Sequence, residues 1–117
     1  MSIRAVTLAL AGATSFAALP ARAEPPQVAA DIAPVHSLVA QVMAGVGTPE
    51  LIVRPGASPH GYALRPSEAG ALQDADLVVW IGPELTPWLD RSLGTLAPEA
   101  ARLTLLAQDE TDRKSVV

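Results

Sequence analysis

An unbroken apolar run at residues 77–81, Leu-Val-Val-Trp-Ile, constrains the fold of this chain more than any other feature. A strand with apolar side chains on both of its faces is typical of a parallel sheet that helices cover on both sides. Gly82 and Pro83 follow the run directly and end it. The run therefore predicts a central strand that is buried on both faces.

Shorter segments on either side of this run repeat an alternation of strand and helix. Apolar runs predict the strands, and residues at helical spacing after a proline or an acid predict the helices. The expected strands are 27–33, 51–53, 77–81 and 103–106, and the expected helices are 34–45, 66–75 and 84–96. This alternation indicates the α/β class, built from parallel βαβ units with right-handed crossovers.

The first expected helix has a clear apolar pattern. Val35, Leu38, Val39 and Val42 recur at i, i+3, i+4 and i+7, which places them on one face of a helix. Gly45 follows and can end the helix in the left-handed conformation. The first unit of the chain is therefore predicted to be a strand followed by an amphipathic helix.

Both ends of the chain differ from its middle. Arg4, the apolar residues 5–19 and the step Ala21-Arg22-Ala23 have the layout of a cleavable secretory signal peptide, and the apolar run is shorter than the ~20 residues of a membrane span. We divide the chain into a signal peptide at 1–23, an α/β lobe at 24–107 and a polar, disordered tail at 108–117. Only four strands fit, so we expect the lobe to be partial.

The charge balance and the absence of cysteine exclude several classes of function. Eight Lys and Arg against twelve Asp and Glu give a net charge of -4, and removal of the signal peptide makes the product more acidic. An acidic chain without a basic patch argues against nucleic-acid binding. Without cysteine there is no disulfide framework, no thiolate metal site and no lipid-modified N-terminal cysteine. We therefore expect a freely soluble periplasmic protein.

The loop at residues 54–65 is the main candidate for function. It leaves the carboxyl end of the second expected strand, where ligands gather in parallel α/β domains, and it is long for such a connection. His60 lies in it between Pro59 and Gly61, one stiff and one permissive neighbour. Neutral imidazole is a common zinc ligand. A lone histidine is also compatible with an exposed loop residue that binds nothing.

Three blocks of sequence resemble a known family. They are PVHSLV at 34–39, GASPHGYALRPS at 56–67 and QDADLVVWIGP at 73–83. Together they closely resemble the zinc-uptake periplasmic substrate-binding proteins of ABC transporters, in cluster A-I. The resemblance implies two α/β lobes joined by a long helix, with the metal in the cleft between them, and it makes His60 the first metal ligand. The second lobe and the interlobe helix are not expected within this chain.

The resemblance also implies a role and partners. It predicts a monomer that captures zinc with high affinity in the periplasm and delivers it to a membrane permease, which a cytoplasmic ATPase drives. Zinc is then a transported ligand and not a catalytic cofactor. The residues after Tyr62 look like the zinc branch of the family, whereas manganese and iron branches tend to place an acid and a proline there. Imidazole-rich sites suit zinc and carboxylate-rich sites suit manganese.

Several alternatives stay open beside this interpretation. The chain could be a truncated remnant without zinc binding of its own, since a zinc site usually has four donors. It could instead be a manganese- or iron-binding member of the family. His36, in the first turn of the first helix, is expected to be solvated or to cap the helix, not to bind metal. An enzyme is not expected, because no nucleophile elbow and no zinc-protease motif is present.

Overall fold

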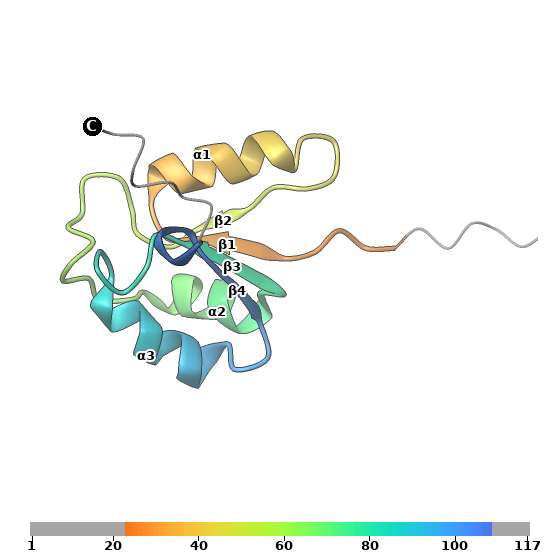
Figure 1. Cartoon of the computed structure of the whole chain (residues 1–117). Coiled ribbons are helices and arrows are strands. Elements are labelled where there is room, and N and C mark those ends of the chain that lie inside the picture. Colours follow the sequence, from red (N-terminus) through yellow and green to blue (C-terminus); the bar gives the residue numbers. More distant parts are fainter. Residues whose placement is uncertain (1–22, 109–117) are drawn as a thin grey trace, which may run out of the picture.

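The computed structural model describes residues 23–108, which contain one sheet of four parallel strands in the order β2-β1-β3-β4 (Figure 1). This confirms the predicted α/β class with parallel βαβ units. The predicted signal peptide and tail lie outside the described residues, apart from Ala23 and Gln108. The elements are β1 (Val28–Ala30), α1 (Ala33–Val42), β2 (Glu50–Leu51), α2 (Pro66–Asp74), β3 (Leu77–Trp80), α3 (Pro87–Leu96), β4 (Ala101–Thr104) and the short 3₁₀ helix η1 (Leu105–Ala107).

All three α-helices have a proline in their first turn, and two of them begin at other residues than predicted. β1 ends at Ala30 and not at 33, because Ile32 is the extended residue before α1 and Pro34 stands in the first turn of that helix. α3 begins at Pro87 and not at 84. The residues before it form a turn, in which the N–H groups of Leu85 and Thr86 both donate to the carbonyl of Gly82.

The fourth strand lies two residues earlier than the apolar residues predict. β4 pairs with β3 from Leu77 opposite Ala101 to Trp80 opposite Thr104. Leu105 and the residues after it then form η1 and leave the sheet. Because register follows the neighbouring strand, the exposed residues Ala101 and Arg102 take part in the sheet despite their weak apolar character.

Helices cover the two faces of the sheet unequally. In Figure 1, α1 lies on one side of the strands, and α2 and α3 lie together on the other. Alternate residues of the strands point to opposite faces, so each face has its own core. The core on the α2–α3 face contains Ala29, Ile52, Leu72, Val78, Trp80, Leu89, Leu93 and Ala97. The core on the α1 face contains Val28, Ala30, Val35, Met43 and Val79.

The α1 face is only partly closed. Val35 is buried, but Leu38 is 60% exposed and Val42 is 85% exposed, although all three belong to the predicted apolar face of the helix. An apolar groove of about 370 Å³ lies between α1 and the side of the sheet formed by β3 and β4. Its lining includes Leu38, Val42, Val79, Leu103 and Leu105. None of the helices within residues 23–108 is long and apolar enough to cross a membrane.

Candidate metal centre

The loop at residues 54–65 begins where the hydrogen bonding between β2 and β1 ends. The N–H of Ile52 donates to the carbonyl of Ala30 at 2.9 Å, and that of Val53 donates to the carbonyl of Asp31 at 2.8 Å. Ile52 and Val53 are both buried. The loop therefore leaves the carboxyl edge of the sheet from a well-anchored point, as the sequence predicted.

Polar contacts to Glu68 close the loop onto the first turn of α2. Tyr62 donates its hydroxyl proton to Glu68 Oε1 at 2.7 Å, and the backbone N–H of Arg65 donates to Glu68 Oε2 at 2.8 Å. Arg54 donates from Nε to the Tyr62 hydroxyl oxygen at 3.0 Å, and its Nε lies 3.6 Å from the Glu68 carboxylate. Glu68 is buried, so these donors compensate its charge where water cannot.

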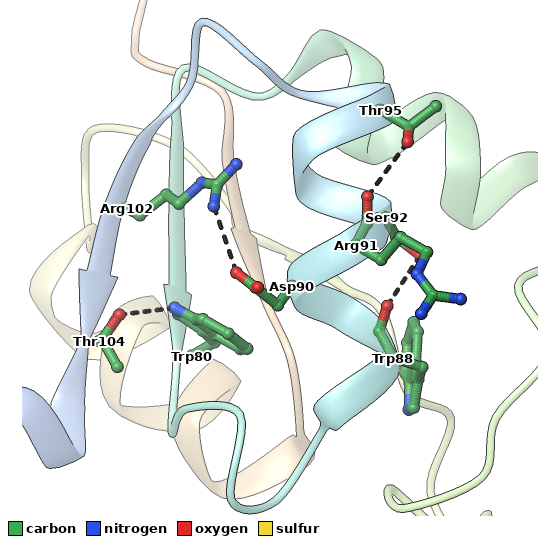
Figure 2. A network of polar contacts seen from close by, with 8 residues as sticks. All are labelled: Trp80, Trp88, Asp90, Arg91, Ser92, Thr95, Arg102 and Thr104. Atoms are coloured by element: carbon green, nitrogen blue, oxygen red, sulfur yellow. Dashed lines mark hydrogen bonds and ion pairs between the residues drawn. The ribbon is translucent and has the colours of Figure 1, made fainter.

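A second attachment joins the middle of the loop to α3. Trp88, in the first turn of α3, donates from Nε1 to the carbonyl of Pro59 at 2.7 Å. Its ring centroid lies 5.7 Å from that of Tyr62, with the planes tilted by 37°. Figure 2 shows the Trp88 ring on the side of α3 away from Trp80 and the strands. Trp88 is partly buried against the core of the α2–α3 face, and its indole N–H holds the loop.

His60 lies between these two attachments. Pro59 precedes it and accepts the Trp88 hydrogen bond, and Tyr62 follows two residues later. The His60 side chain is exposed and makes no hydrogen bond or ion pair with any other described residue. Its imidazole is thus accessible on a backbone that is held on both sides.

No cluster of three potential metal-binding side chains (His, Cys, Asp or Glu) is present among residues 23–108. His36 in particular is engaged elsewhere. Its Nε2 lies 2.9 Å from the carbonyl oxygen of Pro49, so the protonated Nε2 donates to that carbonyl and ties α1 to the segment before β2. Within the described residues, the structure therefore leaves His60 as an isolated metal-ligand candidate.

Asp31 is a buried acid that the sequence reasoning missed. It is fully buried at the carboxyl end of β1, where its two oxygens accept the N–H groups of Ile32 at 2.8 Å and of Ile81 at 2.9 Å. Burial raises the pKa of its carboxyl above 3.8, and the hydrogen bonds from Ile81 and Ile32 oppose that rise. The signal in the sequence was a lone acid inside an apolar strand segment. Asp31 joins the ends of β1 and β3.

Residues 28–115 match the model of the family described as "Zinc-uptake complex component A periplasmic". The high-affinity zinc uptake system protein ZnuA of Paracoccus denitrificans is 51% identical over 112 residues, which are 96% of this chain and 34% of that protein. The protein of the same name from Brucella abortus is 43% identical over 79 residues, 68% of this chain and 23% of that protein. The chain thus spans about a third or less of these relatives.

Solved structures share the fold. The periplasmic zinc binding protein TroA from Treponema pallidum aligns with a TM-score of 0.60 at 22% identity, over 68% of this chain and 28% of that one. A manganese-bound periplasmic metal binding protein from Candidatus Liberibacter asiaticus aligns with a TM-score of 0.62 at 18% identity, over 71% of this chain and 32% of that one. The described lobe therefore has the architecture of part of such proteins.

Proposed function

Because the chain belongs to the family of periplasmic component A proteins of zinc-uptake complexes, which it matches over residues 28–115, we propose that it serves to capture zinc ions in the periplasm. That family match carries the proposal. The relatives are named as zinc uptake proteins and not as enzymes, so binding and not catalysis is the expected activity. Residues 1–23 would direct export, and an ABC permease with its ATPase would receive the zinc.

We assign the metal contact of this lobe to His60. Its exposed imidazole has no other partner among residues 23–108, and the residues on both sides of it are held by Trp88 and Glu68. Imidazole nitrogen suits zinc, whereas manganese prefers carboxylate oxygen. Residues 54–65 contain no acid. The loop chemistry therefore favours zinc over manganese.

One imidazole is a quarter of a usual zinc site. Structural zinc sites have four protein donors, and zinc sites that exchange a ligand keep three. Since no cluster of three donors is present within residues 23–108, we expect these residues alone to bind zinc weakly. High-affinity capture would then need metal ligands from outside residues 23–108. Zinc could favour one conformation of the whole protein only if it binds that conformation more tightly than the others.

A zinc titration of the chain, followed by the NMR signals of its two histidine side chains, tests the assignment. We expect zinc to shift the His60 ring signals and to leave the His36 signals in place, because His36 already donates to Pro49. The variant His60→Ala should lose the zinc response, whereas the matched control His36→Ala should keep it. A response that persists in His60→Ala would refute His60 as the ligand.

A further inference from the structure

Trp88 contacts the loop on both sides of His60. Its indole N–H donates to the carbonyl of Pro59, the residue directly before His60, at 2.7 Å. Its ring lies against Tyr62, two residues after His60. A single side chain from α3 thus contacts both ends of a stretch that runs from Pro59 to Tyr62, and Pro59 is 29 positions away from it in the sequence.

The two contacts connect the loop to packed helices of the lobe. α3 packs on the sheet through the fully buried side chains of Leu89 and Leu93. The first turn of α3, which carries Trp88, is therefore anchored to the core. The hydroxyl of Tyr62 is bonded to Glu68 of α2 at 2.7 Å. The backbone around His60 is therefore attached to two helices, although His60 itself is exposed.

We propose that Trp88 is a positioning residue for metal binding: it fixes the backbone at Pro59 so that the His60 imidazole meets the ion in one orientation. This proposal rests on the proposed function, in which His60 is the metal ligand. A ligand held in advance loses less conformational freedom when the ion binds, and this raises affinity without any new contact to the metal. Trp88 itself does not touch the ion.

A purely structural role for Trp88 is the alternative, because part of its ring packs against the core of the α2–α3 face. The variant Trp88→Phe separates the two roles, since it keeps an aromatic ring and removes the N–H donor. Trp80 offers a matched control. Its indole N–H donates to Thr104 Oγ1 at 2.8 Å in the sheet, away from the loop, so Trp80→Phe loses a similar hydrogen bond elsewhere (Figure 2).

The experiment measures two properties of the chain with NMR: the order of the backbone amides of Ser58, His60 and Gly61, and the zinc affinity read from the His60 ring signals. We expect Trp88→Phe to lower the order of these amides and to weaken zinc binding about 2- to 10-fold, the range of one hydrogen bond. Trp80→Phe should change neither.

The outcomes separate this proposal from the proposed function. If Trp88→Phe leaves loop order unchanged, or lowers it without weakening zinc binding, Trp88 does not position the ligand and the inference is overturned. If zinc fails to shift His60 in the unaltered chain, the assignment of His60 fails and the positioning role fails with it. Loss of loop order in Trp88→Phe would then identify a structural contact only.

Discussion

On the α2–α3 face of the sheet, Leu72, Leu89 and Leu93 are fully buried, whereas on the α1 face Leu38 and Val42 are 60% and 85% exposed. The helices α2 and α3 cover the first face, and α1 covers the second (Figure 1). Apolar side chains stabilise a fold in proportion to the area that they remove from water. The stability of residues 23–108 should therefore depend far more on the closed face than on the open one.

The largest expected effect is at the centre of the closed face. Leu93→Ala should lower the free energy of unfolding by about 2–5 kcal/mol, because it leaves a cavity where the side chain was fully buried. The same substitution on the open face, Leu38→Ala, should cost less than about 1 kcal/mol. Urea unfolding followed by circular dichroism gives both values. Equal losses would show that the α1 face is closed in solution.

The next largest loss of stability should come from Asp31, which joins the ends of β1 and β3. Asp31→Ala should lower the free energy of unfolding by about 1–3 kcal/mol, because the N–H groups of Ile32 and Ile81 lose their acceptor. The control is Asp76→Ala, which removes an exposed acceptor for the N–H of Gln27 and should cost less. Urea unfolding measures both. A smaller loss for Asp31→Ala than for Asp76→Ala would contradict the assigned role of Asp31.

The raised pKa of Asp31 also has a consequence for pH. A carboxyl whose pKa is higher in the folded than in the unfolded chain contributes stability that is fully present below 3.8 and is lost as the pH rises through its folded pKa. Asp31→Asn cannot titrate, so it should remove this fall in stability. Thermal unfolding of the unaltered chain and of Asp31→Asn, from about pH 3 to about pH 7, measures how stability changes with pH in each. Parallel curves would show that Asp31 does not titrate differently on folding.

A smaller loss of stability should come from the hydrogen bond by which His36 attaches α1 to the segment before β2. His36→Ala removes the hydrogen bond to the Pro49 carbonyl and should cost about 0.5–1.5 kcal/mol. Its exposed neighbour Ser37 makes no side-chain hydrogen bond within the described residues, so Ser37→Ala serves as the control and should change stability little. Chemical unfolding again gives the values. If the two variants match, His36 contributes nothing to holding α1.

The smallest effect should come from the rim of the groove. Val42→Gln should change the free energy of unfolding by no more than about 0.5 kcal/mol, because Val42 is already exposed. The same change should reduce the binding of an apolar fluorescent dye to the groove, which Val42 lines. A stability loss comparable to that of Leu93→Ala would mean that Val42 is covered in solution.

Much of the fold could be predicted because its signals are local. The apolar run at 77–81, the prolines at 34 and 66 and the helical spacing of Val35 and Val39 each report on a few adjacent residues. The boundaries at Ala30, Pro87 and Ala101 could not be predicted in the same way. They depend on strand register and on a turn at Gly82, which involve neighbours in space.

His60 could be singled out as the candidate ligand from its loop and its family resemblance, and that assignment remains a prediction. The contacts that hold its loop could not be found from the sequence. Trp88 is 29 residues from Pro59, and a tryptophan in an amphipathic helix gives no sign of which carbonyl its N–H will meet. Only the packing of α3 beside the loop decides that.

By itself, the sequence determined the order of strands and helices, the α/β class and the place of His60 in the loop that follows the second strand, because short-range propensity and patterning control these features. The tertiary structure decided the strand order, the burial of Asp31, the open groove beside α1 and the attachment of the loop to Trp88. Each of these joins segments far apart in the chain: the bond between Asp31 and Ile81 spans 50 residues. Such contacts form only when the whole sheet and its helices pack together.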